Sequence, residues 1–206
     1  MTLRQLAIMI AILMAIAGGW VVWGRRNAPN EGQVMDAQDS RYATYRGARG
    51  ELRVTFQYPK DWPVKEETGQ VEAYREVRIK GPRNLEDTFT LLLAVRSSPL
   101  REHGGKFRTI EELIQHHLSH LFAGAKIVAR KKRMAGGQSA EDITVAYTIP
   151  PLHQPGLKAI EIPVKSRTLF VESHGRLYEL LYNADAREYD EHRDAFEQLL
   201  TTFHFQ

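Results

Sequence analysis

The chain has 206 residues, contains no cysteine and carries a formal net charge of +3 at neutral pH. The lack of cysteine excludes disulfides, thiolate metal sites and cysteine nucleophiles. The excess positive charge belongs to residues 1–50, which hold six basic and three acidic residues, whereas residues 51–206 hold 22 of each. Because the larger part is neutral, we expect no nucleic-acid partner.

An uncharged apolar run covers residues 6–23. Its length is at the short end of what crosses the hydrocarbon core of a bilayer as a helix. Two tryptophans near its end fit the membrane–water interface, where amphipathic indoles accumulate. We therefore expect residues 1–23 to form an uncleaved transmembrane helix, a signal anchor that contacts the bilayer through residues 6–23. The anchor residues are Leu6, Trp20, Trp23, Arg25 and Arg26.

Cleavage of this segment as a secretory signal peptide is the alternative. Ala15-Ile16-Ala17 has the small-x-small pattern that precedes cleavage sites. Cleavage there would leave an apolar new N-terminus, so the pattern favours an anchor. The flanking charges, Arg4 and the terminal amine against Arg25 and Arg26, are nearly balanced and leave the orientation open. Residues 24–50 are polar and are expected to link the anchor to one domain, residues 51–206.

Alternating apolar residues predict strands near residues 52–58, 71–79, 126–134 and 141–149, and an apolar run at 88–95 predicts a central strand. Residues 126–134 and 141–149 are expected to join across Ala135-Gly136-Gly137, and residues 160–172 and 177–183 predict a second hairpin. A capping box at Thr109 begins a helix to Leu121, and a second helix is expected to start near Asp185. The expected class is α+β, a mainly antiparallel sheet of about six to seven strands with helices packed on both faces, preceded by one transmembrane helix.

Several motifs in order resemble PsbP-like domains. Tyr58-Pro59-Lys60-Asp61-Trp62 resembles their opening, and Thr109-Ile110-Glu111-Glu112-Leu113 the start of their helix. A Gly-Gly turn before Ala140, the segment from His174 to Leu180 and a final Thr202-Phe203-His204-Phe205 complete the resemblance, which covers roughly residues 50–206.

The resemblance implies an α/β/α sandwich of the PsbP and Mog type, used as a binding module. PsbP is an extrinsic subunit of photosystem II on the lumenal side, and its relatives include assembly factors. The anchor and the arginine-bearing linker of this chain depart from PsbP.

Two histidines on the predicted helix are the candidate metal ligands. His116 and His120 lie one turn apart on one face and could hold one divalent ion. Glu112 lies about 12 Å from His120 along the helix axis, too far to join the same ion. The alternative is a solvated helix face without a metal, and no other cofactor is expected.

The densest group of cations is a candidate contact for anionic lipid or a partner. On a strand these side chains alternate between two faces, so a lysine-protected edge strand is the alternative. The group comprises Lys126, Arg130, Lys131, Lys132 and Arg133.

We find no nucleophile elbow, phosphate loop, zinc-protease motif or dinucleotide fingerprint, and we expect no enzyme. The expected function is a membrane-anchored, non-catalytic PsbP-like binding or assembly module for a membrane-associated partner, within a membrane-protein complex and on the extracytoplasmic (periplasmic or lumenal) side. The alternatives are a metal-binding accessory protein that uses the helix histidines, or a PsbP-type photosystem II subunit in a photosynthetic source.

Overall fold

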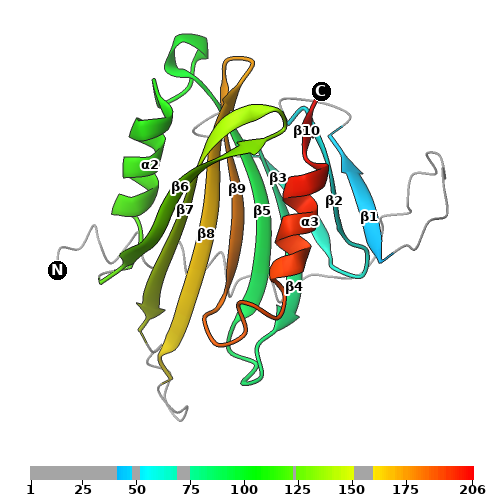
Figure 1. Cartoon of the computed structure of the whole chain (residues 1–206), viewed down its shortest axis with the longest axis vertical. Helices are drawn as coiled ribbons and strands as arrows, with labels where there is room; N and C mark the ends of the chain where they lie inside the picture. The colour runs from blue at the N-terminus through cyan, green and yellow to red at the C-terminus, as the bar shows by residue number, and fades with distance from the viewer. Residues whose placement is uncertain (1–40, 48–51, 69–74, 123, 151–159) are drawn as a thin grey trace. The chain divides into compact units, whose positions relative to one another are not determined.

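Ten strands in two sheets and two α-helices make up the part of the chain that the computed structural model describes, residues 41–47, 52–68, 75–122, 124–150 and 160–206 (Figure 1). Neighbouring strands are antiparallel throughout both sheets. In spatial order, the large sheet consists of β3 (Val64–Thr68), β4 (Arg75–Arg83), β5 (Thr90–Pro99), β9 (Arg176–Asp185), β8 (Ile162–Ser173), β7 (Gln138–Ile149) and β6 (Lys126–Ala135). The small sheet consists of β1 (Tyr42–Arg46), β2 (Val54–Pro59) and β10 (His204–Phe205).

Two tight turns shape the hairpins that the sequence predicts. Gly136 and Gly137 connect β6 to β7 with φ of 56° and 79°, a left-handed conformation that glycine adopts without steric cost. His174 and Gly175 connect β8 to β9 with φ of 50° and 71°. Both predicted hairpins are therefore confirmed.

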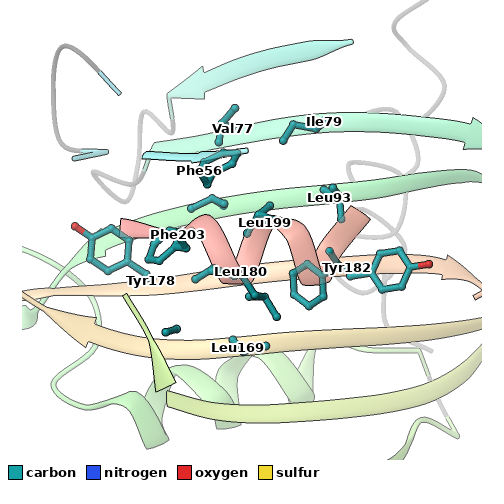
Figure 2. Packing of buried hydrophobic residues seen from close by; sticks show 14 of the residues in the cluster. Phe56, Val77, Ile79, Leu93, Leu169, Tyr178, Leu180, Tyr182, Leu199 and Phe203 are labelled. Carbon is teal, nitrogen blue, oxygen red and sulfur yellow. The ribbon is translucent and has the colours of Figure 1, made fainter. Parts of the chain in front are cut away.

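The main core lies between the large sheet and a layer formed by α3 (Arg193–Thr202) and the small sheet (Figure 2). Successive residues of a strand point to opposite faces, and Leu169 of β8 faces this core whereas Phe170 faces the other side. Each fully buried side chain of this size stabilises the fold by about 1.5–3 kcal/mol. The core includes Phe56, Val77, Ile79, Leu93, Tyr178, Leu180, Tyr182, Phe196, Leu199 and Phe203.

A second, smaller core lies on the opposite face beneath α2 (Ile110–Ser119). The helix begins as predicted: the Thr109 hydroxyl accepts a hydrogen bond from the Glu112 backbone N–H at 3.2 Å, and the Glu112 carboxylate accepts one from the Arg108 backbone N–H at 2.8 Å. The apolar stripe of α2 then packs on the sheet. The core includes Leu113, Ile114, Ile143, Val145, Phe170 and Leu177.

Phe205 of β10 joins the small sheet to both hairpin turns. Its ring lies 6.3 Å from that of His174 and 5.0 Å from that of Tyr178. A Cβ atom at Gly136 would lie 2.7 Å from the same ring. The absence of a side chain at Gly136 therefore lets the β6–β7 turn rest on β10.

The expected fold class is wrong in its layers. The described chain is mostly antiparallel strand, with two ten-residue helices, so helices do not form the layers on both faces of the sheet. The small sheet supplies much of the layer that was assigned to helices. Sequence patterns missed it because β1 lies within the expected linker, residues 24–50, and β10 has only two residues.

One further expectation differs from the structure, and another falls on residues that the structure does not describe. The last helix begins at Arg193 and not near Asp185. Asp185 is the last residue of β9, and its carboxylate accepts hydrogen bonds from Asn84 and Arg187 instead of capping a helix. The expected transmembrane segment, residues 1–23, lies outside the described residues. Among the residues described, no helix is long and apolar enough to cross a membrane.

Candidate functional site

The two candidate metal ligands lie together on α2. The ring centroids of His116 and His120 are 4.1 Å apart. The Nε2 atom of His116 lies 3.3 Å from the Lys106 Nζ, and the Nδ1 atom of His120 lies 2.7 Å from the backbone carbonyl oxygen of His116. The ammonium group opposes a cation at Nε2. Among the described residues, no group of three or more His, Asp or Glu is placed to hold a metal ion, so the pair has no third ligand.

A chain of charged side chains runs from α2 across three strands of the sheet. His117 Nδ1 lies 3.1 Å from Glu179 Oε2 on β9, and Glu179 lies 4.0 Å from Arg96 on β5. Arg96 Nε donates to Glu76 Oε1 on β4 at 2.6 Å, and Arg78 lies 2.9 Å from the other Glu76 oxygen. Burial raises the pKa of Glu179, but the bond from His117 and the charge of Arg96 together hold that pKa below its usual value. These contacts hold α2 on the sheet.

A second polar cluster is buried on the α3 face of the sheet. Arg167 of β8 donates two parallel hydrogen bonds to Asp142 of β7, at 2.9 and 2.7 Å, and a third to Glu197 of α3 at 2.6 Å. Arg133 of β6 lies 3.4 Å from Glu197, and Lys131 lies 4.0 Å from Asp142. Burial lowers the pKa of Arg167, but the bonds to Asp142 and Glu197 raise it above its usual range. The cluster thus ties β6 to the helix.

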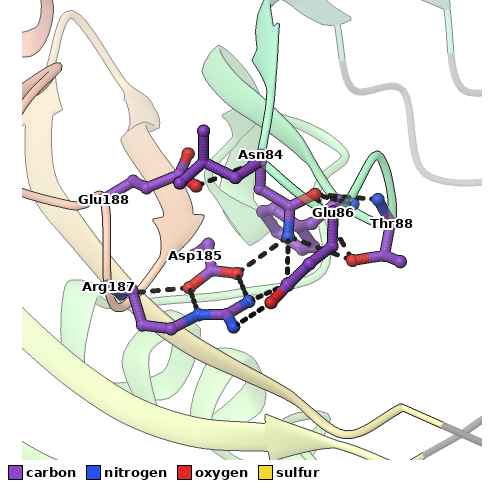
Figure 3. A network of polar contacts seen from close by, with 8 residues as sticks. Asn84, Glu86, Thr88, Asp185, Arg187 and Glu188 are labelled. Atoms are coloured by element: carbon purple, nitrogen blue, oxygen red, sulfur yellow. Dashed lines mark hydrogen bonds and ion pairs between the residues drawn. The ribbon is translucent and has the colours of Figure 1, made fainter.

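A third polar cluster joins the segment between β4 and β5 to the end of β9 (Figure 3). Asp185 accepts hydrogen bonds from Asn84 Nδ2 at 2.9 Å and from Arg187 Nε at 2.9 Å, while Arg187 also binds Glu86. The bond from Arg187 holds the pKa of Asp185 at about 2. The adjoining hollow has a volume of ≈ 10 Å³, room for about one water molecule. It is lined by Pro82, Asn84, Phe89, Leu91, Ala184, Asp185, Glu188 and His192.

These clusters have no clear signal in the sequence. Asp142 and Glu179 are separated from Arg167 and His117 by 25 and 62 residues. Strand register brings the partners together, and the sequence alone does not give that register. The clusters satisfy their own charges internally, which favours a structural role for each.

The five candidate cations all lie on β6, and the register divides them between the two faces of the sheet as alternation predicts. Arg130 and Lys132 stand opposite Ile143 and Glu141, on the α2 face, and Arg130 pairs with Glu111 at 2.9 Å and Glu141 at 3.1 Å. Lys131 and Arg133 stand opposite Asp142 and Ala140, on the α3 face. An irregularity between Ile127 and Ala129 places Lys126 opposite Ala146, on the α3 face as well.

β6 is also an exposed edge. Among the described residues its strand neighbour is β7 alone, and Figure 1 shows it at the margin of the sheet. Five large apolar side chains are exposed in the described chain, and three of them lie on β6: Ile127 (51%), Val128 (58%) and Met134 (62%). Cations and exposed apolar side chains therefore combine on one edge strand, the strongest candidate for a contact surface.

Trp62, by contrast, packs against the main core and lies edge-on to His192 at 6.4 Å. These contacts support a structural role for the indole. The anchor residues Leu6, Trp20, Trp23, Arg25 and Arg26 lie outside the described residues.

No protein-family model matches the sequence, and no curated protein matches it. Solved structures define the class, a PsbP-like fold. The chain is similar to cyanobacterial PsbP (CyanoP) from Synechocystis sp. PCC 6803, with 14% identity and a TM-score of 0.52 over 85% of this chain and 98% of that chain. It also matches LpqN of Mycobacterium tuberculosis, described as involved in cell envelope biogenesis, with 16% identity and a TM-score of 0.48 over 80% and 90% of the two chains. At these identities the likeness concerns the fold alone.

Proposed function

We propose that this chain is a membrane-anchored PsbP-like module that binds a membrane-associated partner on the extracytoplasmic side and has no catalytic activity of its own. The observation that carries this proposal is the match of nearly the whole CyanoP chain to this fold. The apolar run at residues 6–23 supports the membrane location. A binding role fits the polar clusters, whose acidic and basic groups are engaged with one another.

The mechanism of such a module is recognition at a confined surface. A tethered domain meets a partner in the same membrane at an effective concentration that reaches the millimolar range for short flexible linkers. A weak contact surface on the domain is then sufficient for stable association. The metal-accessory alternative has less support, because Lys106 lies beside the ring nitrogen that an ion would need.

Two measurements test the proposal. The full chain should stay in the membrane pellet after alkaline carbonate washing, and a variant that lacks residues 6–23 should be released. Chemical crosslinking in intact membranes should then join the full chain to a defined membrane protein, and the shortened variant should lose that product. Release of the full chain by carbonate would contradict the anchor, and crosslinks confined to the chain itself would contradict the binding role.

A further inference from the structure

The outer edge of β6 is long enough to accept another strand. β6 has ten residues, against five for β3 at the opposite edge of the same sheet. An edge strand presents a row of backbone N–H and C=O groups that can pair with an added strand. The exposed Ile127 and Met134 share the α2-side row with Arg130 and Lys132. That row therefore offers two cations flanked by an apolar side chain at each end.

The charge of β6 selects the chemistry of its partner. The strand contains five cations and no acidic residue. Arg130 and Arg133 already pair with glutamates of the chain. Among the described residues, Lys126 and Lys132 have no ion pair, and they lie on opposite faces. An incoming strand with carboxylates on both of its faces would meet one such lysine on each, and opposite charges across strands are stabilising.

We propose that β6 binds an extended acidic segment of the partner as an additional strand of the large sheet. The inference rests on the proposed function for the existence of a partner, and it names the surface and the chemistry of the contact. Main-chain hydrogen bonds supply affinity in this mode, and the side chains supply specificity. The lysines of β6 repel strands of like charge and admit acidic ones.

Other occupants fit this edge less well. A bilayer is flat, whereas the cations of β6 project from both faces of the sheet. A second copy of β6 would bring five cations against five. The β3 strand of another copy has two glutamates, but Glu66 accepts a hydrogen bond from Tyr45 and Glu67 pairs with Lys65 and Arg78. An acidic segment from another protein is the occupant that the charges favour.

Peptide binding to the full chain in an uncharged detergent tests the proposal. The probe is a fluorescent peptide that repeats Val-Val-Glu-Glu, which places glutamates on both faces of a strand, and its anisotropy reports binding. A second peptide carries N-methyl groups on consecutive amides, which blocks pairing through both of its edges and keeps the charge. We expect the first peptide to bind, and we expect the affinity of the second to be at least about tenfold lower. Equal binding of the two peptides would overturn strand addition.

Matched lysine variants locate the site. Lys126→Gln with Lys132→Gln removes one cation from each face of β6, and the affinity should fall about fivefold through the loss of two cross-strand pairs. Lys60→Gln with Lys80→Gln makes the same change in net charge at exposed positions away from β6, and the affinity should stay unchanged. Equal losses in the two variants would overturn the assignment to β6.

Two further outcomes count against the proposal. Phosphatidylglycerol vesicles that bind through the same lysines, with no binding of the acidic peptide, would assign the strand to lipid. Sedimentation of the chain as an oligomer that masks the edge would assign it to self-association. If the acidic peptide does not bind but the chain still crosslinks to a membrane protein, the assignment to the β6 edge is refuted and the proposed function stands.

Discussion

Replacing Arg167 by methionine should destabilise the fold strongly, because it leaves a buried carboxylate without its main partner. Asp142 is 1% exposed and takes both of its short bonds, at 2.9 and 2.7 Å, from Arg167. Removing one member of a buried ion pair costs about 3–5 kcal/mol. Arg133 at 3.8 Å and Lys131 at 4.0 Å still face Asp142 in the variant, so we expect a cost of about 3 kcal/mol.

Urea unfolding of the full chain in neutral detergent measures this cost. Thermal unfolding under the same conditions should show a melting temperature lower by roughly 6–12 °C for a chain of this length. Arg193→Met is the matched control, because Arg193 and its partner Asp190 have side chains that are 50% and 72% exposed. We expect that control to cost less than about 0.5 kcal/mol.

A double-mutant cycle separates the unpaired charge from lost packing. Asp142→Asn removes the stranded carboxylate, so Arg167→Met with Asp142→Asn should cost less than the sum of the two single changes. Additive costs would show that packing of Arg167 over Phe196, at 5.5 Å, accounts for the loss. A cost for Arg167→Met equal to that of Arg193→Met would refute the reasoning altogether.

Three other changes should have measurable effects. Asp185→Asn should cost about 2 kcal/mol at pH 7, because the folded-state pKa of Asp185 is about 2 and lies below the ordinary value of 3.8. This stabilisation is present above pH 4 and is lost as the pH falls through 2. Urea midpoints of both proteins measured across this pH range should show the difference. Gly136→Ala should cost about 2 kcal/mol in the same assay, since it adds backbone strain and a contact with Phe205. Calorimetric titration of Zn²⁺ should give no saturable binding, because Lys106 lies beside His116.

Each of these predictions has its own control. A stability difference between Asp185→Asn and the parent chain that persists at pH 2 would contradict the assigned charge. Gly137→Ala meets no atom within 4 Å of its added Cβ and should cost less than Gly136→Ala, so equal costs would exclude the contact with Phe205. Saturable Zn²⁺ binding that is lost in His116→Ala would restore the metal hypothesis.

Local patterns predicted those parts of the fold that local chemistry determines. Thr109 and Glu112 form the expected cap, and the Gly136 turn joins the expected strands. The edge position of β6 also agrees with its lysines, because charged side chains protect an open strand edge from unwanted pairing. The alternation of side chains along a strand also correctly predicted that the cations of β6 lie on both faces of the sheet.

The remaining features depend on contacts between distant residues. Asp185 is of a residue type that often caps helices, but its carboxylate accepts a hydrogen bond from Asn84, 101 residues away. The helix starts eight residues later, at Arg193. β10 has two residues and is defined by its pairing with Thr55 and Val54 of β2. No periodicity exists over so short a strand. The candidate metal pair was found from its spacing, but the Lys106 beside it belongs to the loop before α2.

The position of Phe205 between the two hairpin turns affects which face of the sheet each cation of β6 occupies. Shifting a strand by one residue exchanges its two faces, and every cation of β6 would then change sides. Contact between Phe205 and the Gly136 turn opposes such a shift, because the turn would have to move through the ring. A residue that is distant from β6 in the sequence thereby helps to fix which lysine faces each side, and the loss of the Phe205 ring would weaken the control over the charge pattern that an incoming strand meets.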